Sequence, residues 1–145
     1  MAFSLLDKLR GNSFSKEFNL GKDLKVSIRA LTAREDAEIV ARFPNLDLMT
    51  FSNLCRIPTL ARAIEKVNGV PFESSTDILQ DLAERKVENP HATFFTSAEV
   101  VLGKFPVTTI AQLYSFYLEL LLAHRDELEG LKKSSKTLSP DTSGN

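Results

Sequence analysis

Few residues of this 145-residue chain have the type and spacing that catalysis or metal binding requires. Asp77 and Asp81 lie four residues apart, so a helix would place both carboxylates on one face, as a paired acid–base site requires. No third group nearby in sequence would desolvate them, and we interpret the pair as part of a solvated helix face. His91 and His124 lack the HxxxH or HExxH spacing that would bring two imidazoles to one metal. The sequence therefore predicts no metal site.

Cys55 is the single cysteine and the one candidate nucleophile. Nucleophilic catalysis would require the fold to bring His91 or His124 to its thiol. Because its sequence neighbours Phe51 and Leu54 are apolar, we favour a buried, unreactive side chain. One cysteine permits no intramolecular disulfide, which indicates a reducing compartment. The sequence also lacks GxGxxG, GxxxxGK[ST] and GxSxG motifs, so we expect no enzyme, no catalytic residue and no bound cofactor.

Charge and hydropathy narrow the class of protein further. The chain has 18 Lys and Arg against 19 Asp and Glu, a formal net charge of −1, which argues against binding nucleic acid through overall positive charge. No apolar run reaches the roughly 18–20 residues that span a bilayer, and the N-terminus lacks the features of a signal peptide. With 43% hydrophobic residues, the composition predicts one soluble domain that does not contact a membrane.

The N-terminal third contains the clearest secondary-structure signals. Apolar and polar residues alternate over residues 24–31, which predicts a strand. Thr32 and Glu35 follow with the spacing of a capping box, in which hydroxyl and carboxylate satisfy backbone N–H groups at a helix start. We expect this helix to continue to about Arg42, before Pro44 ends it.

Residues 46–72 permit two assignments. A helix is predicted first, to about Arg56, since Pro58 excludes its continuation without a kink. Residues 60–67 then have apolar side chains at helical spacing, with Asn68 and Gly69 as the C-cap. The same Asn-Gly pair is a strong signal for a two-residue hairpin turn, which would make residues 60–67 a strand instead. The residue composition slightly favours the helix.

Two further helices are expected before residue 104. The first covers residues 74–88. The second is short, begins with a capping box of Thr96 and Glu99, and ends at Gly103. The intervening loop carries an aromatic cluster at residues 91–95, which we assign to core or interface packing because no basic residue interleaves it.

Pro106 precedes the longest predicted helix, about residues 107–131. Apolar side chains encircle more of this helix than one core face needs, so it is either centrally buried or contacts a partner. Its core stripe is predicted to consist of Ile110, Leu113, Tyr114, Tyr117, Leu120, Leu121 and Leu128.

Together these elements predict an α+β fold that is mostly α-helical, with one short strand or small sheet near the N-terminus, followed by a helical domain with a long C-terminal helix. We expect residues 1–23 to form a short helix and an extended arm, residues 24–131 the core domain, and residues 132–145 a polar tail. The candidate contact residues for a partner are Leu5, Leu6, Leu9, Phe14, Phe18, Tyr114, Tyr117 and Leu121.

The order of these elements resembles that of small assembly proteins of tailed bacteriophages. The resemblance is carried by RALTAREDAEI (Arg29–Ile39), by TLARAIEKVNG (Thr59–Gly69) and by the Pro-started helix FPVTTIAQLYSFYLELL. The nearest is the T4-type baseplate hub protein family, and tail assembly chaperones share the same general plan. The resemblance covers about residues 24–72 and 105–123, and none of its motifs is catalytic.

The resemblance implies a non-enzymatic structural or assembly protein of a contractile phage tail, at the baseplate or hub. Its partners would be other tail or baseplate proteins and copies of itself, in a virion assembled in the host bacterial cytoplasm. One alternative is a tail assembly chaperone that is absent from the mature virion. An alternative of another class is a small helical regulatory or nucleic-acid-binding module, with a basic patch of Arg56, Arg62, Lys66 and Lys104.

Overall fold

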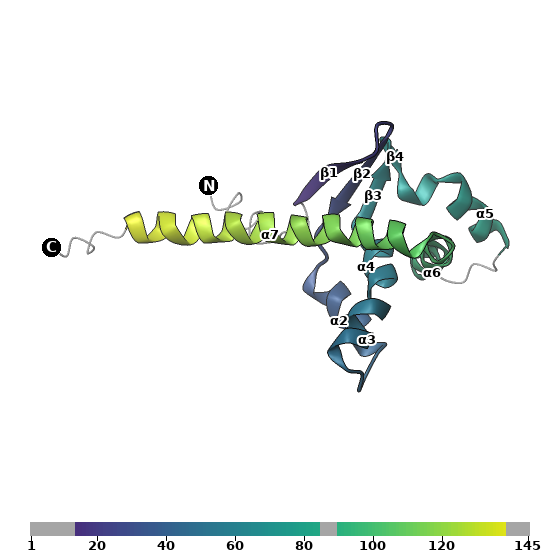
Figure 1. Cartoon of the computed structure of the whole chain (residues 1–145), viewed down its shortest axis with the longest axis horizontal. Coiled ribbons are helices and arrows are strands. Elements are labelled where there is room, and N and C mark those ends of the chain that lie inside the picture. The colour runs from purple at the N-terminus through teal and green to yellow at the C-terminus, as the bar shows by residue number, and fades with distance from the viewer. Residues whose placement is uncertain (1–13, 85–89, 139–145) are drawn as a thin grey trace.

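The computed structural model describes residues 14–84 and 90–138, and for residues 90–93 and 133–138 it describes the backbone alone. The fold is mixed α+β, with a small antiparallel sheet followed by helices, and the last helix is long (Figure 1). The predicted fold class is therefore confirmed. The short helix expected near the N-terminus, which the sequence SLLDKLRG predicts for residues 4–11, lies outside the described residues.

The sheet contains β1 (Ser15–Leu20), β2 (Leu24–Arg29), β3 (Ile64–Val67) and β4 (Val70–Pro71), in the order β1-β2-β3-β4. All neighbouring strands are antiparallel, and Phe18, Val26 and Val67 are in register across three of them. Since side chains in register share a face of the sheet, this row points into the core. Phe18 and Val26 are buried there.

The predicted strand at residues 24–31 is confirmed for Leu24–Arg29 as β2, in which Val26 and Ile28 are buried, and Ala30 is buried just after the strand ends. Residues 15–20, which we expected in an extended arm outside the core domain, instead form the edge strand β1. The β1 sequence contains too few apolar residues for a clear alternation, but Phe18 stacks on Phe116 with ring centroids 4.7 Å apart. That contact fixes β1 to the core.

Helix α2 (Ala33–Ala41) begins as the sequence predicts. The Thr32 hydroxyl accepts from the backbone N–H of Glu35, and the Glu35 carboxylate accepts from the backbone N–H of Thr32. Both halves of the capping box are therefore present. The helix ends at Ala41, with Arg42 as its C-cap.

Residues 48–71 combine both assignments that the sequence permits. Helix α3 (Leu48–Leu54) is followed at once by α4 (Arg56–Ala63), which places Pro58 in the first turn, where its missing N–H costs nothing. The chain then changes to strand β3, so the helix that we favoured over residues 60–67 is wrong for residues 64–67. Asn68 and Gly69 both have positive φ, 51° and 79°, and form the hairpin turn to β4.

After a 3₁₀ turn at Phe72–Ser74, helix α5 covers Thr76–Glu84, within the predicted range. The prediction for α6 (Pro90–Gly103) is wrong at its start: the helix begins at Pro90, so residues 91–95 are not a loop. Thr96 and Glu99 therefore lie inside the helix and not at its start, where a capping box belongs. A proline suits the first helical position as well as it suits a loop, which explains the error.

Helix α7 (Val107–Leu138) has 32 residues, seven more than predicted, and is about 48 Å long. Its buried residues are Ile110, Leu113, Phe116, Tyr117 and Leu120. Three members of the predicted stripe differ, since Tyr114 and Leu128 are half-buried and Leu121 is 37% exposed. Phe116, which we had not placed in the stripe, is buried against Phe18.

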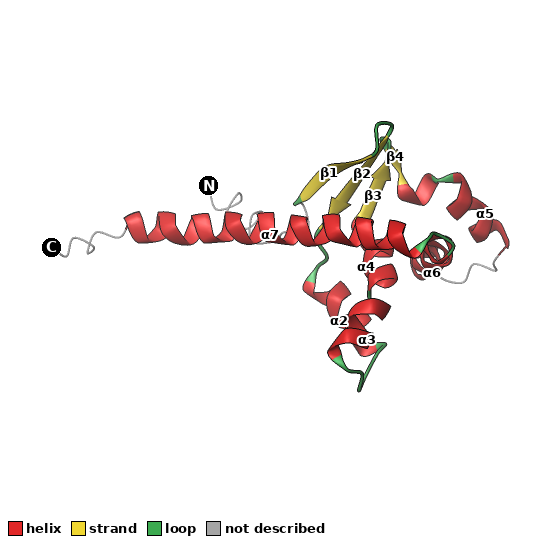
Figure 2. Cartoon of the chain, viewed as in Figure 1, coloured by secondary structure: helices red, strands yellow, loops and turns green. Residues whose placement is uncertain are grey.

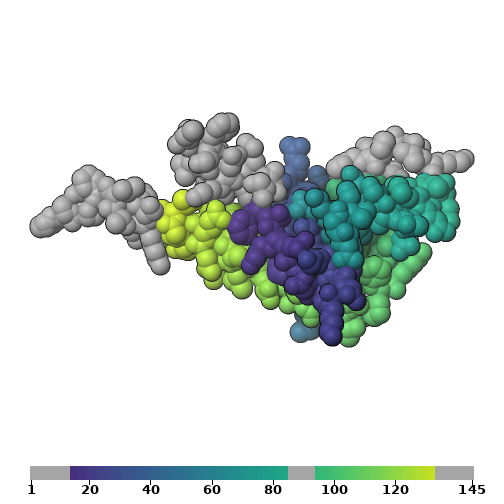
Figure 3. All heavy atoms as spheres, turned by 90° about the horizontal axis from the view of Figure 1, so that it is seen from above, coloured from purple at the N-terminus to yellow at the C-terminus, as the bar shows by residue number. Residues whose placement is uncertain are grey.

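Helix α4 lies at the centre of the molecule and contacts α2, α3, α6, α7 and β3. Its residues 58–63 are all buried, because neighbours surround it on every side. The N-terminal half of α7 packs against the sheet, while its C-terminal half continues beyond the other described elements (Figures 1 and 2). Seen from above, the β1–β2 hairpin lies along α7 (Figure 3).

Candidate functional site

Helices α2 and α3 form a lobe, residues 33–54, that projects from the body on the side of α7 away from the sheet (Figure 2). No residue of α3 is buried, and its contacts with the rest of the molecule are mainly with α4. The Asp47 side chain caps α3 by accepting from the backbone N–H of Thr50. Phe43 and Phe51 pack edge to face with centroids 6.4 Å apart, which connects the turn before α3 to the helix itself.

The lobe exposes a set of large apolar side chains. Leu48 is 81% exposed and Met49 is 76% exposed, the highest values for large apolar residues in α3. The complete set, called here the lobe surface, is Val40, Leu46, Leu48, Met49 and Leu54. Single exposed apolar residues are common on proteins, but five within fifteen residues of one small lobe make this lobe a candidate binding surface.

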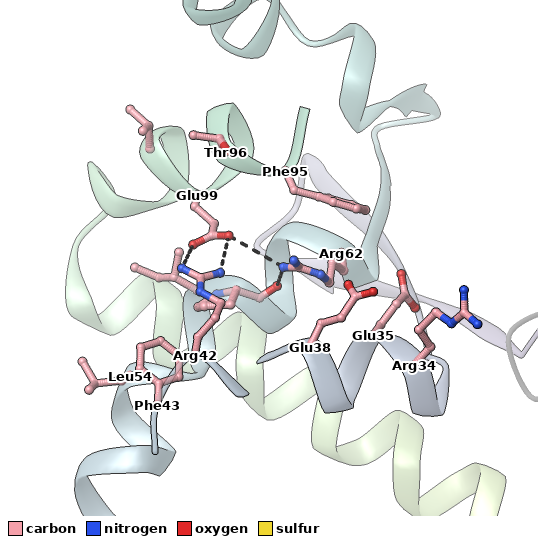
Figure 4. Close-up of a pocket in the computed structure, with 13 residues that line it drawn as sticks. Arg34, Glu35, Glu38, Arg42, Phe43, Leu54, Arg62, Phe95, Thr96 and Glu99 are labelled. Atoms are coloured by element: carbon pink, nitrogen blue, oxygen red, sulfur yellow. Dashed lines mark hydrogen bonds and ion pairs between the residues drawn. The ribbon is translucent and has the colours of Figure 1, made fainter. Parts of the chain in front are cut away.

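A groove of about 740 Å³ lies between the lobe, α4 and α6 (Figure 4). Helix α2 supplies Arg34, Glu38 and neighbouring residues to one wall, and α6 supplies Phe95 and Val100 to the other. Leu54 lines the groove as well as the lobe surface, so the two features are continuous. A cavity of this volume is within the range that binds small molecules or short peptide segments.

The inner part of the groove contains the carboxylate of Glu99 and the guanidinium groups of Arg42 and Arg62. Arg42 donates from both terminal nitrogens to the two oxygens of Glu99, each at 2.9 Å (Figure 4). Nη1 of Arg62 lies 3.7 Å from the same carboxylate. The hydrogen bond to Glu99 raises the pKa of Arg42 further, so this residue is charged at every physiological pH.

Arg62 itself is 9% exposed and is fixed from several sides. Its Nη1 donates to the Pro58 carbonyl at 3.0 Å, and its guanidinium lies 4.5 Å from the centre of the Phe95 ring. Among the described residues, none accepts a hydrogen bond from its Nε, which is buried. The groove therefore contains a fixed, largely buried positive charge.

The structure gives different surroundings to the predicted contact residues. Phe18 and Tyr117 are in the core, and Phe14 packs on the His124 ring with centroids 5.0 Å apart. Leu121 is exposed on α7, and so are Leu118 and Leu122. Tyr114 is half-buried. The other three, Leu5, Leu6 and Leu9, lie outside the described residues.

Cys55 is buried, and its Sγ lies 3.9 Å from the Tyr114 hydroxyl. His124 is about 15 Å further along α7 than Tyr114, because each residue advances a helix by about 1.5 Å, so the fold does not bring this imidazole to the thiol. The side chain of His91 lies outside the described part. Burial and the nearby thiol raise the pKa of Tyr114 to about 12, so its hydroxyl is neutral at physiological pH.

Asp77 and Asp81 line a small cleft of about 210 Å³ between α5 and the end of α6, where Lys104 also lies. Among the described residues, no group of three or more His, Cys, Asp or Glu side chains is placed to hold a metal ion. Within the same residues, no helix has the length and apolar character needed to cross a bilayer. The basic patch proposed from sequence loses Arg62, because that side chain is buried.

Neither a protein-family model, nor a curated protein, nor a solved structure matches this chain. The site is therefore interpreted from its own geometry. Sequence reasoning missed the lobe surface, since Leu48, Met49 and Leu54 have the same apolar character that a core helix would have. It also missed the pairing of Arg42 with Glu99, which are 57 residues apart in sequence.

Proposed function

We propose that this chain is a non-enzymatic structural or assembly protein of a bacteriophage contractile tail, a baseplate or hub component that acts through protein–protein contacts. The observation that carries the proposal is the lobe surface. Helix α3 places no residue in the core of its own chain, although Leu48, Met49 and Leu54 are large and apolar. Exposed apolar side chains grouped in this way are typical of a surface that a partner covers.

The kind of assembly comes from the resemblance, not from the surface itself. Two of the segments that resemble phage assembly proteins, Arg29–Ile39 and Thr59–Gly69, contain the start of α2, most of α4 and the hairpin turn. They supply the elements that support the lobe. The proposed partners are other tail or baseplate proteins and further copies of this chain, and the proposed location is the virion.

Quantitative mass spectrometry of purified particles tests the proposal in a phage that encodes this chain. We expect the chain in the particle at a fixed ratio to the tail proteins. Presence in infected cells together with absence from particles would favour a tail assembly chaperone instead. Deletion of the gene provides the second arm, in which we expect particles without functional tails. Normal tails and a normal titre without the gene would contradict both forms of the proposal.

A further inference from the structure

The residues that line the groove between α2, α4 and α6 favour one kind of ligand. We propose that it binds an acidic side chain of a partner protein, presented on a peptide segment that also carries large apolar residues. The inference rests on the proposed function, because it names the chemistry of the partner that such a protein would bind. It concerns a different feature from the lobe surface, although Leu54 belongs to both.

The charges at the inner end of the groove favour an incoming carboxylate. Glu99 accepts two hydrogen bonds from Arg42, and its distance of 3.7 Å from Arg62 is an ion pair without a hydrogen bond. These three groups together have a net charge of +1. The other charged residues that line the groove, Arg34, Glu35 and Glu38, add −1, so the preference for a carboxylate is local to Arg62. Since Arg62 is only 9% exposed, water screens this charge poorly, and a second carboxylate would be attracted strongly.

The hydrogen bonds of Arg62 point to the same ligand. Its Nη1 contacts the Pro58 carbonyl and the Glu99 carboxylate, whereas its buried Nε has no acceptor among the described residues. A buried donor without a partner destabilises the protein unless water or a ligand supplies an acceptor. A carboxylate that approaches from the Nε side, after a small shift of the guanidinium, would accept in the geometry that arginine prefers.

The walls of the groove determine what accompanies this carboxylate. Leu54 is 47% exposed and Val100 is 36% exposed at the rim, and Phe43 and Ile57 are half-buried beside them. These side chains match large apolar residues next to the acidic one. A volume of about 740 Å³ holds several side chains, which fits a peptide segment better than a single ion.

A phosphate-rich ligand is a poorer match for the same site. Glu35, Glu38 and Glu99 all line the groove, and Glu38 is exposed on α2. Arg34, Arg42 and Arg62 balance these three carboxylates, so the groove has no excess of basic residues, whereas a nucleic acid binds through several basic contacts to its phosphates. The charges of the groove therefore favour a protein partner.

Peptide display on the full chain tests this inference while the partner is still unidentified. A random peptide library is selected against the immobilised protein, and the selected peptides are synthesised and their Kd values are measured by fluorescence anisotropy. We expect the selected peptides to contain Asp or Glu next to Leu, Ile, Phe or Met. Replacing that acidic residue by its amide should weaken binding about tenfold or more, because a hydrogen bond to a charged group is lost.

Two variants of the protein locate the binding to the groove. Arg62→Met keeps the aliphatic stem and removes the charge, and Val100→Glu adds a repelling carboxylate at the rim, where Val100 is 36% exposed. Both should weaken binding about tenfold or more. Val107→Glu is the matched control, because Val107 is 80% exposed at the start of α7 and outside the groove, and it should bind as the unaltered chain does.

Three results would overturn the inference: no selected peptide, selected peptides without acidic residues, or binding that Val100→Glu leaves unchanged. Binding of a fluorescent single-stranded oligonucleotide to the unaltered chain, with loss of that binding in Arg62→Met, would also overturn it. If the chain is nevertheless found in purified particles, the proposed function stands and its contacts use another surface. If the groove binds acidic peptides but deletion of the gene leaves tails normal, the proposed function fails alone.

Discussion

At the scale of single residues, the Glu35 carboxylate connects the sheet to the start of α2. It accepts two hydrogen bonds from Arg29 at the end of β2, at 2.9 and 2.8 Å, and a third from the backbone N–H of Thr32. Burial would raise the pKa of Glu35, but these hydrogen bonds outweigh it and hold the pKa below its usual value. The carboxylate therefore stabilises the fold in its charged form.

Because the pKa of Glu35 is lower in the folded protein, its contribution to stability is present above the unfolded value of 4.5 and is lost as the pH falls through the folded value. We expect Glu35→Gln to lower the free energy of unfolding by about 1–2 kcal/mol at pH 7 and by less at pH 3. Urea unfolding at the two pH values measures this. Glu38→Gln, on the exposed side of the same helix, is the control and should change little. Equal losses of stability in Glu35→Gln and Glu38→Gln would contradict the stabilising role of the Glu35 carboxylate.

Tyr114 gives a second pH-dependent prediction, at the alkaline end. Its pKa is raised to about 12 by burial and by Cys55, so its contribution to stability is present below pH 10 and is lost as the pH rises toward 12. We expect the unaltered chain to lose stability over this interval, and Tyr114→Phe to lose less. Since the chain has two Tyr and no Trp, absorbance at the tyrosinate band reports the ionisation directly. An ordinary pKa for both tyrosines would rule out this account.

Residue roles that depend on long-range contacts were not predictable from the sequence. Thr96 and Glu99 have the spacing of a capping box, but α6 begins earlier, at Pro90. Glu99 therefore lies inside the helix, and its carboxylate accepts hydrogen bonds from Arg42 instead of capping the helix. Thr32 and Glu35 have the same spacing and do form a capping box. The two pairs differ in the helix boundary, which local sequence leaves undetermined when a proline suits both a loop and a helix start.

At the scale of elements, the turn between β3 and β4 fixes the edge of the sheet. Asn68 and Gly69 adopt positive φ, and the Asn68 side chain accepts from the backbone N–H of Lys25 at 2.7 Å. The turn therefore joins β3 to β4 and is also hydrogen-bonded to β2. An Asn-Gly pair in a two-residue hairpin supplies the left-handed backbone conformation at the lowest steric cost.

Gly69→Ala should therefore destabilise the protein by about 1–2 kcal/mol, because an L-residue is strained at a φ of 79°. No atom lies within 4 Å of the added methyl group, so the cost is conformational and not a clash. Gly103→Ala is the matched control, since it is equally open but lacks positive φ, and it should be neutral or slightly stabilising. Thermal unfolding of the two variants measures the difference. A neutral Gly69→Ala would show that the turn is not as described.

The elements themselves were largely predictable where a local signal was strong. The alternation in β2, the capping box of α2 and the proline before α7 each identify an element without tertiary information. Residues 60–67 were ambiguous because helix α4 and strand β3 follow one another without a loop. The edge strand β1 is stabilised by pairing with β2 and by the Phe18–Phe116 stack, which are tertiary contacts.

At the scale of the whole molecule, the described residues form a body around α4 from which two parts extend: the α2–α3 lobe and the C-terminal half of α7 (Figure 1). The sequence indicated partner contacts on α7, and Leu118, Leu121 and Leu122 are exposed there. It did not indicate the lobe surface. Whether an apolar helix is a core element or a contact element depends on what surrounds it, and that is decided by the fold.

The central claim is that the lobe surface is the part of this chain that contacts a tail protein. The most direct test is the titre of infectious particles from a phage that carries Leu48→Glu and Met49→Glu, compared with one that carries Leu79→Glu. Leu79 is 52% exposed on α5 and outside the lobe, so it controls for the replacement of an exposed leucine by a charged residue. We predict that the double variant folds, yet lowers the titre to that of a gene deletion, while Leu79→Glu does not. A normal titre with the double variant would contradict the account.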